Sequence, residues 1–504
     1  MRPVSVRRNV IANGVGQAWV AVMGLAFVPV YIRYLGIEAF GLVGLFAVMQ
    51  AWLTLLDVGM TPTLGREMAR YTSGAHSAQS IRDLLRSLEF VCFGIAGLIF
   101  IAVCVASTWL ASDWLKVEKL QPEAVQSAIE VMAFVIASRF VESIYRSALF
   151  GLQRQVWYNS VNAILATFRS VGALAVLAWV SPTIETFFMW QSVVSLLSVV
   201  VFAFGVYRAL PSAPRPATFS VDALRGVWRF AGGMTGITLL AVLLTQIDKV
   251  LLSRLLSLEA FGYYTLAATV SGALYLLTTP ITTALFPRLV ELLTRGTSSM
   301  LASAYHRGAQ MVTVLTAPSA LLLAFFGEGV LFAWTGNVDL ARSAGPILSA
   351  LALGNFLNGL MYVPYQLQLA HGWTHFALGI NIAAVLLLVP AIFWVVPRYG
   401  SIGAAWVWIF LNAGYVLIGI QLMHRRLMST EKWHWYVRDV GFPTLGAGIA
   451  LLVLSGLKPN SLADRAEWFF FLTTGLLGAL AISALTVRDL RVRMVLSIRG
   501  LWSK

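Results

Sequence analysis

Long apolar runs separated by short polar segments fill almost the whole of this chain. An α-helix needs about 20 apolar residues to cross the roughly 30 Å hydrocarbon core of a bilayer. We predict about fourteen membrane-spanning helices, near residues 10–33, 40–62, 88–110, 125–150, 158–180, 184–207, 229–255, 260–287, 308–334, 343–370, 373–397, 402–424, 438–457 and 466–487. The predicted fold is therefore an all-α polytopic membrane protein.

The composition agrees with a chain that is mostly surrounded by lipid. Of 504 residues, 59% are hydrophobic and only 12% are charged, which is too few to cover the surface of a water-soluble enzyme of this length.

The net charge of +14 comes from 36 basic and 22 acidic residues. The basic excess gathers in alternate loops, at 66–86, 208–229, 288–307, 425–438 and 488–504. By the positive-inside rule, these loops and both termini are predicted to be cytoplasmic, and no nucleic-acid surface is expected.

The remaining loops are short and leave no room for an outer domain. A membrane-embedded glycan-assembly enzyme would need a larger outer loop with catalytic residues. We find no nucleophile–base pair, phosphate-binding glycine loop or metal-ligand spacing, so we expect no enzymatic activity, no cofactor and no metal site. Since there is no Walker motif, transport would be driven by a coupling ion, H⁺ or Na⁺, or by the membrane potential, and the sequence leaves this choice open.

A motif recurs in the two halves of the chain. Residues 30–43 read VYIRYLGIEAFGLV, and residues 251–264 read LLSRLLSLEAFGYY. Arg33 and the tetrad EAFG thus return 221 positions later, beginning with Arg254. Because six predicted helices precede the second copy, both copies start on the same side of the membrane, which indicates two parallel six-helix lobes.

The repeat predicts how the chain is divided. The expected parts are an N-terminal six-helix lobe at 1–207, a cytoplasmic linker at 208–228, a C-terminal six-helix lobe at 229–428, and two additional helices with a basic cytoplasmic tail at 429–504. Two similar lobes around a central cavity can rock against each other, which is the usual geometry of alternating access.

Two motifs resemble the start of a known transporter family. Residues 33–45 fit RxLGxxxFGxxxL, residues 57–69 fit DxGxxxxxxRxxA, and the midpoint 246–267 is similar to the seventh and eighth spans of the same family. These features resemble the polysaccharide transporter family, the flippases for O-antigen and related lipid-linked oligosaccharides, within the superfamily that includes multidrug exporters and the lipid II flippase. The resemblance implies a V-shaped twelve-helix core of the multidrug-exporter type. It also implies a basic central cavity that holds the pyrophosphate of the substrate while the polyprenyl tail stays in lipid.

Two other transporter classes stay open. A cation-coupled multidrug exporter commonly carries a carboxylate in its first span, whereas residues 10–31 contain no charged side chain. The major facilitator class also has paired six-helix repeats, but the loop at 57–70 lacks the expected run of glycine and basic residues. Both observations favour the polysaccharide transporter resemblance.

Charged residues inside predicted spans mark a candidate binding site. A charged side chain at the centre of a bilayer costs about 2.5–3.5 kcal/mol on insertion scales. Arg139, Glu142 and Arg146 are three and four residues apart, so they share one face of a helix. We predict that this positive stripe binds an anionic substrate, because a guanidinium can bind phosphate oxygens through two donors. The alternative is a structural Arg-Glu-Arg triad that holds this helix to its neighbours.

Arg169 lies near the middle of the next predicted span, 158–180, which contains no carboxylate. We predict that Arg169 contacts the pyrophosphate, with a bond to Glu142 as the alternative. At an almost equal offset of 219 positions, the equivalents of the four charged residues are uncharged: Asn358, Met361, Tyr365 and Leu388. Phosphate recognition is therefore expected in the N-terminal lobe alone.

Three further charged residues are candidates for coupling or for structure. Asp248 and Lys249 are adjacent, so their side chains are expected to diverge by about 100° around the helix. Lys249 is then either a second cavity cation or a partner for another helix, and Asp248 is a coupling or structural candidate. Asp57 either organises the cytoplasmic turn that follows it or binds a coupling ion.

Together these features predict a flippase that acts by alternating access. Its expected substrate is a polyprenyl-diphosphate-linked oligosaccharide, an O-antigen or exopolysaccharide repeat unit, moved from the cytoplasmic to the periplasmic leaflet. Its expected partners are this lipid-linked substrate, membrane lipids, and the polysaccharide polymerase and chain-length machinery.

Overall fold

The computed structural model describes residues 6–57, 59–221, 224, 242–243, 245–459, 461–488 and 490–492. Several predictions fall outside the described residues. These are the first part of the predicted span 229–255, the end of the linker 208–228, and the last basic residues of the tail, Arg493, Arg499 and Lys504.

The chain divides into two compact units, Met1–Gly262 and Tyr263–Lys504. The finer division into two six-helix lobes, a linker and an additional helix pair stays a prediction.

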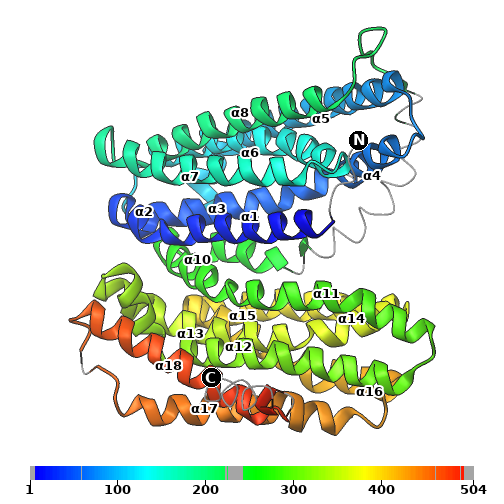
Figure 1. Cartoon of the computed structure of the whole chain (residues 1–504). Coiled ribbons are helices and arrows are strands. Elements are labelled where there is room, and N and C mark those ends of the chain that lie inside the picture. The colour runs from blue at the N-terminus through cyan, green and yellow to red at the C-terminus, as the bar shows by residue number, and fades with distance from the viewer. Residues whose placement is uncertain are drawn as a thin grey trace, which may run out of the picture. The chain divides into compact units, whose positions relative to one another are not determined.

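The first unit is a bundle of helices that lie side by side (Figure 1). Its helices are α1 (Val6–Ala26), α2 (Val28–Leu35), α3 (Ile37–Leu53), the 3₁₀ helix η1 (Thr54–Asp57), α4 (Met60–Thr72), α5 (Ala78–Trp109), the π-helical turn η2 (Leu110–Trp114), α6 (Pro122–Gly151), α7 (Gln155–Trp179) and α8 (Ile184–Ala209). Helix α6 packs against α4, α5 and α8, and most of its apolar side chains from Val125 to Leu149 are buried. The charged stripe predicted on α6 therefore lies on the helix that is most enclosed by its neighbours.

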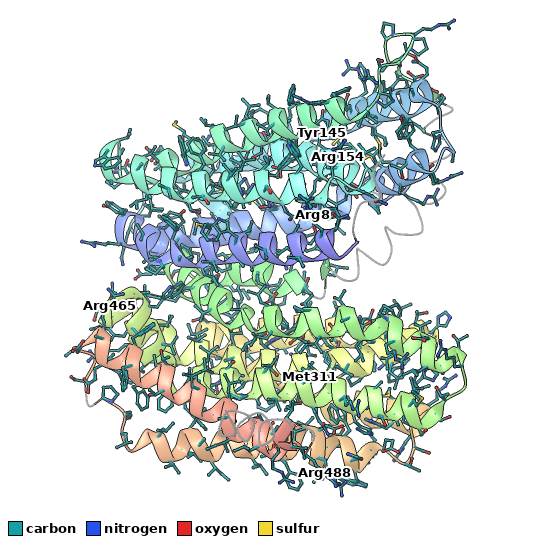
Figure 2. The ribbon with its side chains drawn as sticks, in the orientation of Figure 1. Arg8, Tyr145, Arg154, Met311, Arg465 and Arg488 are labelled. Carbon is teal, nitrogen blue, oxygen red and sulfur yellow. The ribbon has the colours of Figure 1, made fainter. Side chains whose placement is uncertain are left out.

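A buried carboxylate ties α6 to two of these neighbours. The side chain of Glu89 in α5 accepts hydrogen bonds from the hydroxyl of Tyr145 in α6, at 2.9 Å, and from the hydroxyl of Tyr207 in α8, at 2.8 Å. Figure 2 labels Tyr145 among the other side chains. Because these bonds satisfy the carboxylate inside the bundle, Glu89 fixes three helices relative to one another.

The second unit is a bundle around α12. Its helices are α11 (Leu274–Thr294), α12 (Ser298–Thr335), α13 (Val338–Leu360), α14 (Tyr362–Ala370), α15 (Thr374–Gly414), the π-helical turn η3 (Tyr415–Gly419), α16 (Ile420–Leu427), the π-helical segment η4 (His434–Gly441), α17 (Phe442–Ser455) and α18 (Arg465–Thr486), and α10 (Leu258–Gly272) passes from the first unit into it. Arg465, labelled in Figure 2, begins α18 and donates to the backbone carbonyls of Ala333, at 3.2 Å, and Trp334, at 3.0 Å. These bonds attach the C-terminal helices to the end of α12.

The exposed surface of the helices is apolar. Large hydrophobic side chains such as Val105, Trp179 and Phe410 are more than 70% exposed. Exposing so many apolar side chains to water would be costly, whereas in lipid it is not. The described residues contain no β-strand, and the all-α polytopic fold class is confirmed: the chain is a multi-pass membrane protein.

Twelve helical segments among the described residues are long and apolar enough to cross a membrane. Eleven of them each correspond to one predicted span. The twelfth, Thr374–Leu427, has 54 residues and contains two predicted spans, 373–397 and 402–424. The backbone departs from helical geometry at Gly400, with φ of +62° and ψ of −149°, which glycine adopts without the steric cost of a Cβ. The predicted span 229–255 is only partly described, so the exact count of fourteen is not confirmed.

The two copies of the repeated motif contact each other within the first unit. At Gly41, the position of a Cβ would lie 2.5 Å from the carbonyl oxygen of Leu258, and at Gly262 it would overlap the carbonyl oxygen of Ile37. Ile37 and Leu258 are themselves equivalent in the repeat, since 258 − 37 = 221. Each copy thus uses its glycine to admit the first helical turn of the other, and a side chain at either glycine would separate the two helices.

The glutamates of the two copies bind one segment before α6. The carboxylate of Glu38 accepts hydrogen bonds from the backbone N–H groups of Glu118, at 2.6 Å, and of Lys119, at 2.9 Å. The Nζ atom of Lys119 forms an ion pair of 2.5 Å with Glu259. The recurrence of EAFG therefore has a structural cause: the glutamate binds the loop and the glycine permits the close approach.

We predict that Gly262→Ala destabilises the protein while Gly272→Ala, in the same helix, does not. The added Cβ at Gly262 overlaps backbone, whereas nothing lies within 4 Å of the Cβ position at Gly272. Overpacking of this kind costs about 1–3 kcal/mol. Thermal unfolding of the purified full-length variants in detergent measures the difference, and equal unfolding temperatures for the two variants would contradict the close contact between the motif copies.

Candidate functional site

The charged stripe of α6 lines a cavity inside the first unit. The cavity has a volume of about 500 Å³, and it brings Arg139, Glu142 and Arg146 of α6 together with Arg169 of α7 and Asp57 of η1. The spacing of three and four residues places the α6 side chains on one helical face, and α7 supplies the third arginine. Four of the predicted substrate-binding residues thus surround a single hollow.

Arg139 is held by neutral partners. Its Nη1 atom donates a hydrogen bond of 2.7 Å to Oε1 of Gln50 in α3, and its guanidinium lies 5.0 Å from the centroid of the Phe46 ring. A cation over an aromatic face is stabilised without being neutralised. Its Nε atom is buried and donates no hydrogen bond to any described residue, so the guanidinium keeps unused donors beside the cavity.

Arg169 also keeps donor capacity. Its side chain is half-buried, and its Nε atom is buried and donates no hydrogen bond within the described part of the chain. Its backbone carbonyl accepts a hydrogen bond of 3.1 Å from Nε1 of Trp190, which fixes this turn of α7 against α8. The position of Arg169 is therefore set by its backbone, while its charged end faces the cavity.

No carboxylate of the described residues lies within 4.0 Å of the guanidinium nitrogens of Arg139, Arg146 or Arg169. Glu142 is close enough to attract all three electrostatically, but it forms no ion pair of that length with any of them. Arg146 is the most exposed of the three and interacts with the hydroxyl of Tyr158. Three guanidinium groups thus line the cavity without a direct ion pair to a carboxylate of the described residues.

Asp57 has a contact that organises the chain after it. Its carboxylate accepts hydrogen bonds from the backbone N–H of Thr61, at 3.1 Å, and from the hydroxyl of Thr61. Gly59 has φ of +72°, so the turn between η1 and α4 needs the glycine of the DxG motif. The same carboxylate lines the cavity, where three arginines face two carboxyl groups.

Asp248 and Lys249 do not diverge as the sequence analysis expected. The Nζ atom of Lys249 lies 3.6 Å from Oδ1 of Asp248, and it donates a hydrogen bond of 2.8 Å to the carbonyl of Thr245. The expectation was wrong because the flexible four-carbon stem of lysine can fold back along the helix. Neither residue lines the cavity formed by α6 and α7.

Several uncharged polar residues of the cavity were not singled out from the sequence. Gln50, Ser143, Tyr158 and Asn162 all line it. Each is a polar group in a largely apolar segment, which could have marked it as a cavity residue. A single amide or hydroxyl in a membrane helix is, however, also common in helix–helix contacts. Without the cavity, nothing distinguished these residues from structural ones.

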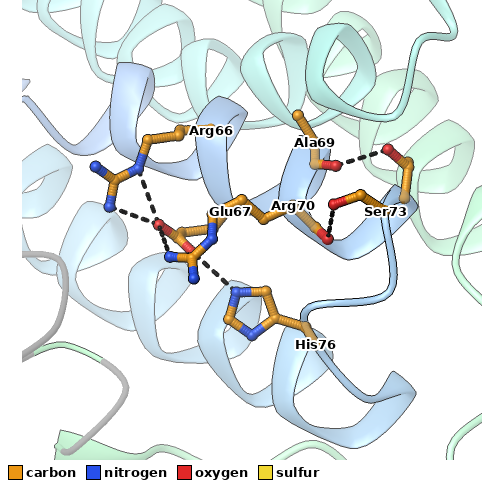
Figure 3. A network of polar contacts seen from close by, with 7 residues as sticks. Arg66, Glu67, Ala69, Arg70, Ser73 and His76 are labelled. Atoms are coloured by element: carbon orange, nitrogen blue, oxygen red, sulfur yellow. Dashed lines mark hydrogen bonds and ion pairs between the residues drawn. The ribbon is translucent and has the colours of Figure 1, made fainter.

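The end of the DxGxxxxxxRxxA motif forms a compact ionic cluster on α4 (Figure 3). Glu67 accepts a hydrogen bond of 2.7 Å from Nη2 of Arg66, forms an ion pair of 3.2 Å with Arg70, and bonds His76 at 2.7 Å. Burial opposes ionisation of Glu67, but the bonds to His76 and Arg66 and the charge of Arg70 outweigh it and lower the pKa of Glu67. The ionic cluster fixes the turn that follows α4 in the first unit, which is the unit that contains the cavity.

The equivalent positions in the second unit carry a neutral network. Asn358 donates a hydrogen bond of 2.8 Å to Asn412 and accepts one of 3.2 Å from the hydroxyl of Tyr275, and Leu388 is buried. The sequence predicts charged residues in the first half of the chain and uncharged ones at the equivalent positions of the second half. In the structure, an amide network occupies these positions in the second unit, whereas the first unit has guanidinium groups.

Comparison with solved structures identifies the fold. The lipid II flippase MurJ, in an inward closed conformation, matches with a TM-score of 0.70 at 13% identity, over 95% of this chain and 99% of that chain. An inward-facing multidrug resistance transporter of the MATE family, in the MOP superfamily, matches with a TM-score of 0.63 at 14% identity, over 86% of this chain and 97% of that chain. The fold is that of this transporter superfamily, as predicted.

The family is shown by the sequence itself. A family model described as "Polysaccharide biosynthesis protein" matches residues 6–293, and the chain belongs to this family. The match includes both motifs on which the resemblance was based, at 33–45 and 57–69. The chain is accordingly a multi-pass membrane protein of the polysaccharide biosynthesis family.

Two relatives are similar over long stretches. A protein of Shigella flexneri named "Putative O-antigen transporter" is 21% identical over 434 residues, which is 85% of this chain and 100% of that protein. The "Teichuronic acid biosynthesis protein TuaB" of Bacillus subtilis (strain 168) is 25% identical over 276 residues, which is 54% of this chain and 56% of that protein.

Proposed function

We propose that this protein is a flippase for polyprenyl-diphosphate-linked oligosaccharide. It moves the sugar head group of an O-antigen or exopolysaccharide repeat unit from the cytoplasmic to the periplasmic leaflet by alternating access. The observation that carries the proposal is the cavity of the first unit, lined by Arg139, Arg146 and Arg169 with no carboxylate ion-paired to them among the described residues.

The chemistry of the cavity suits a diphosphate. A diphosphate carries several acceptor oxygens, and guanidinium groups bind such oxygens through parallel N–H donors. Electrostatic attraction is much stronger in a low-dielectric cavity than in water. The apolar exposed surface of the helices offers the polyprenyl chain a lipid environment while the head group occupies the polar hollow.

The names of the relatives support the same substrate class. One is named as a putative O-antigen transporter and the other as a teichuronic acid biosynthesis protein, and the solved flippase of similar fold is named for lipid II. All three names refer to cell-surface glycans. The sugar of the repeat unit is left to experiment, because the cavity residues that we identify would bind the diphosphate and not the sugar.

The proposed setting is the bacterial inner membrane, with both termini in the cytoplasm. The proposed partners besides the lipid-linked substrate are membrane lipids and the polysaccharide polymerase with its chain-length machinery. The proposed driving force is a coupling ion, H⁺ or Na⁺, or the membrane potential. Glu142 and Asp57 are the cavity carboxyl groups that a coupling cation could use.

A cation-coupled multidrug exporter is less well supported by the cavity. Such a substrate is amphipathic and commonly cationic, so its cavity would be lined by acids and aromatic rings. Here three arginines outnumber two carboxyl groups, and a cationic drug would be repelled.

We predict that Arg139→Ala and Arg169→Ala each abolish or strongly reduce surface glycan export while the protein still inserts into the membrane. Each change removes charged hydrogen bonds of about 1.5–3 kcal/mol to the diphosphate, or roughly a tenfold to hundredfold loss of affinity. Complementation of a flippase-deficient strain, with glycan detected at the cell surface, measures the effect.

Arg208→Ala is the matched control. Arg208 is an exposed arginine of α8 in the same unit, and it does not line the arginine cavity. Export should stay at the wild-type level in this variant. Unchanged export in both cavity variants, at wild-type protein levels in the membrane, would remove the site assignment.

The predicted topology has its own test. Reporter fusions should place residues 66–86, 208–228 and 488–504 in the cytoplasm, because these segments carry the basic excess. The measurement is the activity of reporters that are active only in the cytoplasm or only outside it, fused at each of these segments. An outside signal at 208–228 would refute the arrangement of six helices, linker and six helices.

A further inference from the structure

The second unit contains a cluster of histidine and carboxylate side chains far from the arginine cavity in sequence. His306 lies in the third turn of α12, Glu431 precedes η4, and His434 is the first residue of η4. One ligand atom from each of the three residues lies within 4.8 Å of the other two. We propose that these three residues bind a divalent transition-metal ion of the Zn²⁺ type.

The distances suit three ligands of one small ion. Nε2 of His306 lies 3.1 Å from Oε2 of Glu431, and Nδ1 of His434 lies 3.7 Å from the same oxygen. Zinc binds imidazole nitrogen and carboxylate oxygen at about 2.0–2.2 Å in tetrahedral sites. Ligands of a tetrahedron with bonds of that length are separated by about 3.3 Å, which lies between the two observed distances.

Asp439 contacts the ring nitrogen of His306 that is not proposed to bind the ion. Its Oδ2 atom bonds Nδ1 of His306, and its Oδ1 atom accepts a hydrogen bond of 2.8 Å from the side chain of Gln310. A carboxylate that accepts from Nδ1–H keeps that nitrogen protonated, so a bound ion would displace the proton that Nε2 shares with Glu431 and take Nε2 as its ligand. Asp439 is therefore a positioning residue: it orients Nε2 of His306 toward Glu431 and His434.

The cluster is enclosed on one side and open on the other. The side chains of Asp439 and His306 are 0% and 9% exposed, whereas those of Glu431 and His434 are 29% and 37% exposed. The two imidazole rings are stacked, with centroids 4.2 Å apart. An ion could thus reach the site from solvent and keep water in its fourth position, and the nitrogen and oxygen donors suit Zn²⁺ better than the hard cations Mg²⁺ or Ca²⁺.

The positions of the three ligands in the fold indicate the structural role of a bound ion. It would join the start of α12 to the segment that leads into η4 and α17, and α12 packs against both of these elements. The loop that contains Glu431 lies among those predicted to be cytoplasmic. A bound ion would therefore fasten α17 to the central helix of the second unit, independently of the cargo that the protein carries.

Zinc binding to the chelator-treated full-length protein in detergent tests the proposal. We expect the wild type to bind about one Zn²⁺ per chain, to gain thermal stability with Zn²⁺, and to show visible absorption of tetrahedral type with Co²⁺. His434→Ala and Glu431→Gln should each weaken Zn²⁺ binding tenfold or more and lose the thermal shift. Asp439→Asn should weaken Zn²⁺ binding about tenfold to hundredfold, as expected for a residue that hydrogen-bonds a metal ligand without contacting the ion itself.

His371→Ala is the control, because His371 lies between α14 and α15 and its Nδ1 atom contacts the carbonyl of Leu367. It should bind Zn²⁺ as the wild type does. His434→Ala and Glu431→Gln change partly exposed side chains and leave the buried contact between His306 and Asp439 intact, so they should fold. Absence of saturable Zn²⁺ binding to the wild type, or equal affinity in the wild type and the two ligand variants, would overturn the proposal.

Discussion

Three guanidinium groups in the middle of apolar helices are the constraint on which this protein's proposed activity depends. Placing a charge at the centre of a bilayer costs about 2.5–3.5 kcal/mol on insertion scales, and Arg139 and Arg169 both lie well inside long helices. A carboxylate in direct contact would offset this cost and close the site. Instead, Arg139 is held by the amide of Gln50 and the ring of Phe46. These partners orient the cation but leave its charge for an anionic ligand.

The rest of the first unit supports the walls of this cavity. Glu89 joins three helices through tyrosine hydroxyls, and Asp57 fixes the turn into α4. Gly41 and Gly262 let the two motif copies approach closely. The contact of Glu89 holds α6, which carries Arg139 and Arg146, and the bond from Trp190 to the backbone of Arg169 holds α7. A fixed spacing favours a ligand whose acceptor oxygens are also fixed, as in a diphosphate.

Much of this arrangement could be predicted from the sequence, because membrane helices obey strong rules. Apolar runs gave eleven of the twelve candidate spans directly, and the spacing of Arg139, Glu142 and Arg146 predicted a shared face. The failures have physical causes. Lys249 reaches its neighbour through a flexible stem, which the spacing along the chain does not report. Gln50 faces Arg139 across 89 positions and His306 faces Glu431 across 125, so no local pattern could join them.

Direct binding of the lipid carrier tests the central claim most sharply. Native mass spectrometry of the purified protein with polyprenyl diphosphate and polyprenyl monophosphate compares two lipids that differ by one phosphate. The account predicts that the wild type prefers the diphosphate and that a variant lacking both Arg139 and Arg169 binds the two lipids equally. If the double variant kept the full preference for the diphosphate, the arginine cavity would not be the site that recognises the substrate.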